Sequence, residues 1–193
     1  YRGDLTIERN RSAKININDS CSFWLEGLPA NLTVTTFLAN IRNVGRVYSS
    51  RVYPPFRNIP TSAAKVVFVT TEASRTFFRR CLQEGFMIDG HAATVVHHRV
   101  LAAEMTGLRK TRVLVITGPS TTVNVRYLEA QWRRWLHWQL DKVVQRWTQG
   151  HETSIEYHFG SVQGQSEAAA HAMRCSPDDF PGVRFCYGAD PCA

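Results

Sequence analysis

The sequence repeats one order of expected strands and helices. In its first half, β-branched and aromatic runs alternate with apolar residues at helical spacing, and Pro29, Gly45 and Gly85 separate the segments. Thr33 is expected to cap the first helix. The spacing predicts a strand over residues 23–28, a helix over 34–41, strands over 46–53 and 64–70, a helix over 77–82 and a strand over 93–100. The predicted order is therefore β-α-β-β-α-β.

The same order returns in the second half. The pattern predicts a strand over 113–116, a helix over 125–136, strands over 142–147 and 154–159, a helix over 166–174 and a strand over 183–187. The fold class is then α+β, with two ferredoxin-like units, each a four-stranded antiparallel sheet with two helices on one face. We expect an N-terminal arm over 1–20, a first domain over 21–100, a linker over 101–110 and a second domain over 111–193.

Two segments of the first unit carry a family resemblance. Residues 21–29 read CSFWLEGLP and residues 63–70 read AAKVVFVT. They resemble the two signature strands of the RNA recognition motif (RRM), and a weaker copy begins at Arg112. The chain is thus similar to two RRMs in tandem. The resemblance implies that these two strands lie side by side at the centre of a sheet, where outward side chains stack on bases.

Strand alternation selects the residues expected on the open face of the first sheet. Phe23 and Leu25 should point to the helices, so Trp24 should point outward. The family's octamer motif implies that Val66 and Phe68 also face RNA, although an aromatic residue is usual at the first of these two positions. Each stacked base is worth roughly 1–3 kcal/mol. We expect weak to moderate binding of single-stranded RNA, the alternative being that the aromatic residues are packed away.

The positive charge is concentrated in the first unit. The chain carries a net charge of +7, and residues 21–100 hold nine Lys and Arg against four Asp and Glu, whereas residues 111–193 hold eight of each. Since Lys and Arg attract phosphates, a nucleic-acid footprint is expected in the first unit. Arg51 and Arg99 are candidate phosphate or base contacts, and Tyr48 is a further stacking candidate. For each of the three, a solvated surface residue is the alternative interpretation.

The second unit lacks this pattern. On its first strand, Val113 and Val115 are expected to face the core, which leaves Leu114 on the open face. On its third strand, three apolar side chains alternate with two polar ones: Ile155, Tyr157 and Phe159 against Glu156 and His158. If the apolar set packs on the helices, the open face is acidic and holds no stacking residue. The opposite register would expose the aromatic residues instead. We expect an RRM-like fold that does not bind RNA through its sheet.

A helix of the second unit offers a different surface. Tyr127, Arg134 and Trp138 share one side of the predicted helix, away from the core-facing Trp132 and Trp135. Exposed Trp, Tyr and Arg are typical of protein-binding hot spots. We expect the second unit to make protein contacts, with a partner or in a homodimer, or to act as support. Packing of this surface on the first unit is the alternative.

Several classes of function have no pattern in their favour. No H-E-x-x-H, P-loop or G-x-S-x-G motif occurs, and the five Cys include no C-x-x-C pair. We therefore expect no enzyme, no cofactor, no metal and free thiols. No apolar run approaches the roughly 18 residues of a membrane helix, so no membrane partner is expected. The missing initiator Met suggests a piece of a longer protein, expected to be intracellular, in the nucleus or cytoplasm.

A looser likeness covers nearly the whole chain. Residues 31–33, 61–65 and 183–193 resemble tandem-RRM proteins of filamentous fungi, a likeness that implies no specific activity. The sequence as a whole predicts an RNA-binding module, in which the first RRM holds single-stranded RNA and the second serves protein contacts or support. The alternative is a protein-interaction scaffold made of two pseudo-RRMs that bind no RNA.

Overall fold

The chain forms two compact units. The computed structural model describes residue 6 and residues 11–193. One unit comprises Tyr1–Leu108 together with Pro191–Ala193, and the other comprises Arg109–Asp190. Residues 1–5 and 7–10 of the arm expected over residues 1–20 lie outside the described residues; its described part contains a short 3-10 turn, η2 (Ile17–Asp19).

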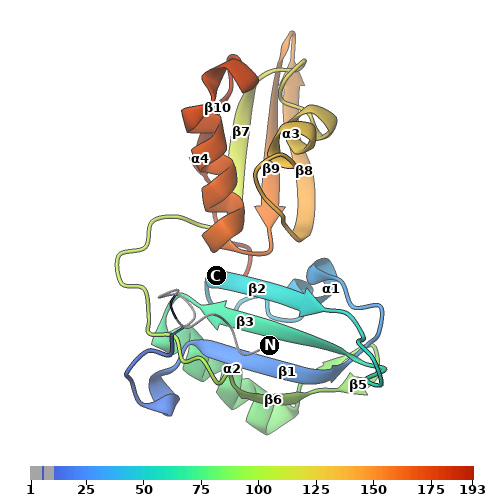
Figure 1. Cartoon of the computed structure of the whole chain (residues 1–193), viewed down its shortest axis with the longest axis vertical. Helices are drawn as coiled ribbons and strands as arrows, with labels where there is room; N and C mark the ends of the chain where they lie inside the picture. The colour runs from blue at the N-terminus through green and yellow to red at the C-terminus, as the bar shows by residue number, and fades with distance from the viewer. Residues whose placement is uncertain (1–5, 7–10) are drawn as a thin grey trace. The chain divides into compact units, whose positions relative to one another are not determined.

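The first unit has the predicted ferredoxin-like order. Its elements are β1 (Ser22–Leu28), α1 (Val34–Ala39), β2 (Val47–Tyr53), β3 (Ser62–Phe68), α2 (Thr71–Glu84), β4 (Met87–Ile88), β5 (His91–Ala92) and β6 (Thr94–His97). The four main strands are antiparallel in the order β2-β3-β1-β6, with both helices on one face (Figure 1). The short hairpin β4-β5, which the sequence pattern did not indicate, precedes the last strand.

Local signals in the sequence set the helix ends of this unit. The side chain of Thr33 accepts a hydrogen bond from the backbone N–H of Thr36, so the predicted cap of α1 is confirmed. Gly85 ends α2 with a φ of 73°, a backbone conformation that favours glycine. Gly45, which follows α1, lies directly against Ala73 of α2. A Cβ at this position would lie 2.3 Å from the Cβ of Ala73, so the close contact requires glycine.

The core of the first unit lies between the sheet and its two helices. Phe23 and Phe68 from the sheet meet Phe77 of α2, with ring centroids 5.2 Å apart in both contacts. All three side chains have 1% or less of their surface exposed. At roughly 25 cal/mol for each Å² of buried apolar surface, such rings dominate the stability of a small unit.

The second unit repeats the order and the sheet. Its elements are β7 (Val113–Pro119), α3 (Val125–Trp132), β8 (Leu140–Gln149), β9 (Glu152–Phe159), the π-helical turn η3 (Val162–Ser166), α4 (Glu167–Cys175), the 3-10 turn η4 (Pro177–Asp179) and β10 (Arg184–Tyr187). The antiparallel strand order β10-β7-β9-β8 is equivalent to that of the first sheet. The predicted fold class, with two ferredoxin-like units, is confirmed.

Helix α3 is shorter than the sequence pattern indicated. It begins after Asn124, whose side chain accepts a hydrogen bond from the backbone N–H of Tyr127, and it ends at Trp132. The backbone N–H groups of Trp135 and Leu136 then both donate to the carbonyl of Trp132, which tightens the last turn. No Gly or Pro marks this end, and Leu136 remains buried, so the apolar spacing continues past the real helix.

A buried ion-pair network holds the start of the second unit. The guanidinium of Arg112 donates to Asp190 at 2.9 Å and to Asp141 at 3.0 Å, and its side chain is fully buried. It also donates to the backbone carbonyl of Phe159 at 3.0 Å. The network therefore joins the residue that precedes β7 to the start of β8, the end of β9 and the segment that follows β10.

The last residues of the chain belong to the first unit. The backbone carbonyl of Cys192 accepts hydrogen bonds from the N–H groups of Val44 and Gly45, and its side chain is buried in the core of that unit. The expected second domain over 111–193 therefore differs from the observed division. All five Cys are free thiols, and Cys175 and Cys186 are exposed whereas Cys192 is buried.

Candidate nucleic-acid interface

The open face of the first sheet carries one row of side chains across all four strands. The pairing aligns Arg51 of β2 with Lys65 of β3, Lys65 with Trp24 of β1, and Trp24 with Val96 of β6. The neighbours of Trp24 along β1, Phe23 and Leu25, are fully buried toward the helices, so the row faces away from them. Trp24 lies on the open face as predicted, and it is partly exposed.

Aromatic rings surround Trp24 on this face. Its ring centroid lies 5.2 Å from that of Tyr53 and 5.9 Å from that of His98. The indole N–H donates to a carboxylate oxygen of Glu26 at 2.7 Å, which fixes the orientation of the ring. The guanidinium of Arg51 lies over the Tyr53 ring, 5.3 Å from its centroid. The cluster thus combines π surfaces with a cation, the combination that single-stranded nucleic acid requires.

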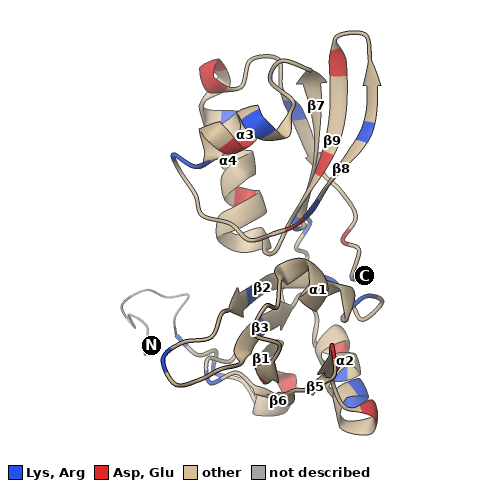
Figure 2. Cartoon of the chain, turned by 90° about the vertical axis from the view of Figure 1, so that its right-hand side faces the viewer, with Lys and Arg blue, Asp and Glu red and all other residues tan. Residues whose placement is uncertain are grey.

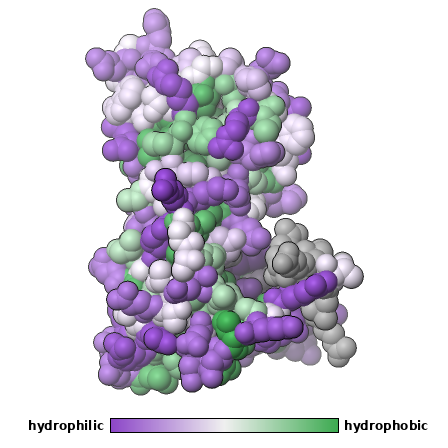
Figure 3. Space-filling view, turned by 90° about the vertical axis from the view of Figure 1, so that its left-hand side faces the viewer, coloured by the Kyte–Doolittle hydropathy of each residue, from purple (hydrophilic) through white to green (hydrophobic). Residues whose placement is uncertain are grey.

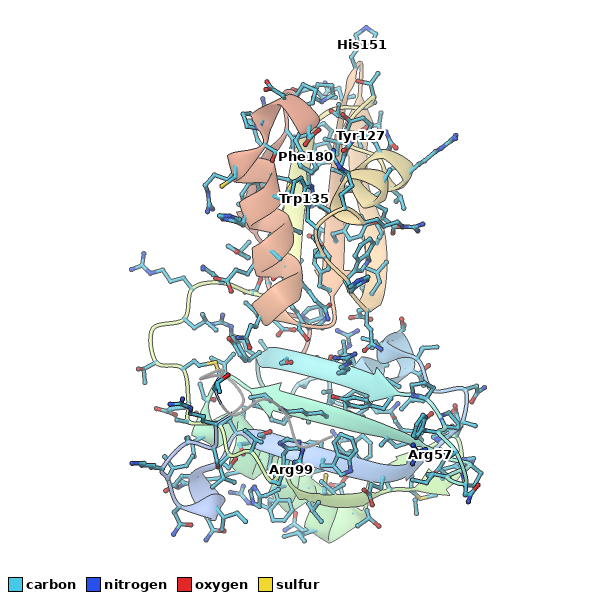
Figure 4. The ribbon with its side chains drawn as sticks, in the orientation of Figure 1. Arg57, Arg99, Tyr127, Trp135, His151 and Phe180 are labelled. Carbon is cyan, nitrogen blue, oxygen red and sulfur yellow. The ribbon has the colours of Figure 1, made fainter. Side chains whose placement is uncertain are left out.

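Positive groups gather beside the cluster. Burial lowers the pKa of Lys65, and the positive charge of Arg99 lowers it further. Burial also lowers the pKa of His98, with a contribution from Lys65, so the imidazole is neutral at pH 7. Arg99 lies against the sheet, whereas Arg57 lies at its end, in the β2–β3 loop (Figure 4). An anion placed here would relieve the repulsion between Lys65 and Arg99.

Two residues predicted to face RNA lie on the opposite side of the sheet. Val66 and Phe68 have no exposed surface, and both belong to the core under the helices. Because Val66 pairs with Phe23 and Lys65 pairs with Trp24, the open face of β3 carries Lys65 and Val67 instead. The octamer motif was aligned one residue out of place, and a shift of one residue reverses the face of every side chain.

Of the three other residues predicted to contact RNA, two are exposed and one packs against the core. Arg51 is exposed on the open face, in the row described above, and Arg99 is exposed just after β6. Tyr48 packs against the core of the unit, so it does not join the aromatic cluster. Tyr53, which the sequence analysis did not select, joins it instead. The period of two along β2 links Tyr53 to the selected Arg51 and could have identified it.

The second sheet presents a different open face. Leu114 pairs with Tyr157 and is fully buried in the core, so the expectation that it faces outward is wrong. Val115 lies on the open face in its place, opposite Glu156. Glu156 does lie on the open face, as predicted from the packing of the apolar set. The expectation that this face holds no stacking residue is wrong, because Trp147 of β8 is exposed on it, opposite Ser154.

The carboxylates on the second open face are paired with basic side chains. Glu156 accepts from Arg146 at 3.2 Å and contacts His158 at 2.9 Å, while Glu152 accepts from Arg184 at 3.0 Å. Burial lowers the pKa of His158, so the imidazole is neutral at pH 7. The views coloured by charge and by hydropathy show both signs on the second unit, and a surface of small apolar patches among polar residues (Figures 2 and 3).

The three residues predicted to form one protein-binding surface do not lie together in the structure. Tyr127 and Arg134 both reach Asp179: the Tyr127 hydroxyl donates to its backbone carbonyl at 3.0 Å, and Arg134 pairs with its carboxylate at 3.1 Å. Trp138 instead packs on the buried Trp132. The exposed tryptophan is Trp135, with 58% of its surface accessible. Figure 4 shows Tyr127 and Trp135 on the helix-covered side of the second sheet.

Other kinds of site find little support in the described residues. Within residue 6 and residues 11–193, no group of three or more His, Cys, Asp or Glu is placed to hold a metal ion. The helices described there are all too short or too polar to cross a membrane.

Comparison with known proteins found similar solved structures but no similar sequences. No model of a protein family matches the sequence, and no curated protein matches it either. The first two RRM domains of the yeast poly(U)-binding protein have a TM-score of 0.36 at 13% identity, over 88% of this chain and 99% of theirs. RNA recognition domains 1 and 2 of Drosophila melanogaster Sex-lethal have a TM-score of 0.33 at 13% identity, over 87% and 99%. An RRM of Rna15 with bound RNA has a TM-score of 0.35 at 19% identity, over 46% of this chain and 90% of its own.

Proposed function

We propose that the chain binds single-stranded RNA on the open face of its first unit. The observation that carries the proposal is the row of Arg51, Lys65 and Trp24, which places two cations next to a partly exposed indole. Tyr53 and Arg99 extend this surface on either side. The proposal keeps Trp24, Arg51 and Arg99 from the predicted site, replaces Val66 and Phe68 by Lys65 and Tyr53, and leaves out Tyr48.

The arrangement binds RNA by stacking and by charge. Bases stack on Trp24 and Tyr53, and each stacked base contributes roughly 1–3 kcal/mol. Arg51, Lys65 and Arg99 attract the phosphates that link those bases. Three phosphate contacts with a single strand give a slope of about −2 for the logarithm of the binding constant against that of the salt concentration. Binding of this kind is tolerant of sequence, because every base has a π face.

The second unit serves protein contacts or support in this proposal. Its open face has an acidic residue, Glu156, in the position where the first sheet has Lys65, so a cation that could attract phosphate is replaced by a carboxylate that already pairs with Arg146. A protein scaffold without RNA binding is the second candidate function. Trp135 favours it, because this exposed ring lies 5.3 Å from the Arg134 guanidinium in an arrangement that suits a protein hot spot. An RNA partner places the protein inside the cell, in the nucleus or cytoplasm.

A fluorescence-anisotropy titration tests the proposed function. The probe is a labelled pool of short random single-stranded RNAs, at low and at physiological salt. We expect micromolar, salt-sensitive binding that Trp24→Ala weakens by roughly 5- to 150-fold, the equivalent of one stacked base. Trp147→Ala is the matched control, since this Trp is exposed on the open face of the second unit. Absence of binding at low salt, or equal losses in the two variants, would overturn the proposal.

A further inference from the structure

A groove runs along the helix-covered side of the first unit. It has a volume of about 280 Å³ and lies between α2, the turn η2 and the helix-facing side of the sheet. Five residues of α2 line it: the buried Ser74 and four residues at the helical spacing i, i+3, i+4 and i+7, Arg75, Phe78, Arg79 and Leu82. One face of α2 therefore presents alternating basic and apolar side chains to the groove.

The floor of the groove is aromatic and uncharged. The ring of His97 lies 4.8 Å from Phe23 and 4.9 Å from Phe78, measured between centroids. Burial lowers the pKa of His97, so the imidazole stays neutral at pH 7. Its Nδ1 atom is buried without a hydrogen-bond partner among the described residues. The floor therefore favours an apolar or aromatic side chain over a charged one.

The rim of the groove is basic and apolar. Leu82 has 72% of its surface exposed, although it flanks an apolar floor. Arg75 pairs with Asp19 at 2.8 Å, while Arg79 forms no ion pair with the residues that the structure describes. Figure 2 shows the basic bands along α2. The rim thus offers an uncompensated guanidinium next to open apolar surface.

We propose that this groove docks an acidic peptide segment of a partner protein. A large apolar side chain of the segment fills the groove between Phe78 and Leu82, and a carboxylate next to it pairs with the Arg79 guanidinium, whose planar fork matches a carboxylate. Charge complementarity selects an acidic partner. A peptide fits better than RNA, because the floor formed by Phe23, Phe78 and the neutral His97 is a narrow slot for a single apolar side chain.

The groove is separate from the proposed RNA surface. Phe23 faces the groove and the next residue of β1, Trp24, faces the open side, so the sheet itself lies between the two sites. One protein can then hold RNA and a peptide at the same time. This separation makes failure of one proposal distinguishable from failure of the other.

Selection from a displayed library of short random peptides tests the proposal. The full chain is the target, and the selected peptides are then measured by anisotropy against Arg79→Glu/Leu82→Glu. Both side chains are exposed on α2, so the variant should keep the native circular dichroism spectrum. We expect selected peptides that combine Asp or Glu with a large apolar residue, and at least about a tenfold loss of affinity in the variant.

A matched variant and the RNA titration provide the controls. Arg80→Glu/Met87→Glu makes the same changes at exposed positions of the same unit outside this groove, and it should bind the selected peptides as the unchanged protein does. RNA affinity should also stay within about twofold in the groove variant. The proposal is overturned if no peptide is enriched, if the enriched peptides are basic, if both variants lose affinity equally, or if the groove variant loses RNA binding instead.

Discussion

Two aromatic residues of the first unit should respond to the same substitution in opposite ways. Phe68 and Trp24 were both expected to stack on RNA, but the structure buries Phe68 completely and leaves Trp24 partly exposed. We predict that Phe68→Ala mainly destabilises the first unit, whereas Trp24→Ala mainly weakens RNA binding.

The magnitudes follow from the contacts of each ring. Phe68 lies 5.2 Å from Phe77 and 6.3 Å from Phe23, and truncation of such a buried ring costs about 3–5 kcal/mol of unfolding free energy. Trp24 is partly exposed, and its closest ring contact, with Tyr53 at 5.2 Å, is worth about 1 kcal/mol; His98 lies further away, at 5.9 Å. The two effects on stability should therefore differ by roughly a factor of three or more.

Urea unfolding followed by far-UV circular dichroism measures both effects. Because two units can unfold separately, Phe159→Ala, which removes an equally buried ring from the second unit, identifies which transition belongs to which unit. RNA affinity is then measured where each variant is fully folded. A stable Phe68→Ala protein with weakened RNA binding would show that Phe68, after all, faces the ligand and would refute this assignment.

Three further predictions concern charged and titrating groups. Lys65→Met should keep the fold and reduce the salt slope of RNA binding by about 0.7, one single-strand phosphate contact, in titrations over a salt series; an unchanged slope excludes the contact. Because burial holds the pKa of His158 below 6.5, its stabilising contribution is present above pH 6.5 and is lost as the pH falls toward the folded-state pKa. His158→Gln should flatten that loss in urea unfolding at stepped pH, and an identical profile would contradict it. Arg112→Met leaves Asp141 and Asp190 buried without their cation, so urea unfolding should show a loss of about 3–5 kcal/mol in the second unit, and a loss near zero would refute the network's role.

The order of the elements was predictable because it depends on local signals. The cap at Thr33 and the stop at Gly85 each act over a few residues, and both were read correctly. The apolar spacing located every main helix, but α2 begins at Thr71, six residues before the start that the spacing indicated. The hairpin β4-β5 was missed because two-residue strands have no period to detect. The end of α3 was missed because Leu136 continues the apolar spacing after the helix has ended.

The faces of the central strands were harder to predict than the strands themselves. A run such as Val66 to Val69 is apolar on both sides, and all four residues are buried, so alternation cannot decide which of them face the helices. The partner strand decides it: Lys65 lies opposite Trp24, and Leu114 lies opposite Tyr157. Pairing between distant segments is a tertiary property, so a motif aligned within one strand can be displaced by one residue.

The two sheets show how one topology can carry different surfaces. Equivalent positions across the open faces form two rows, which read Arg51, Lys65, Trp24 and Val96 in the first unit and Val144, Glu156, Val115 and Cys186 in the second. Three of the four differences remove what RNA binding needs. Val144 replaces the cation Arg51, Glu156 replaces the cation Lys65 with an anion, and Val115 replaces the indole of Trp24. None of these side chains lies in the core between sheet and helices, so the changes leave the fold intact. The open faces of the two units therefore differ in the groups that RNA binding needs, and that face is where a test of RNA binding discriminates between them.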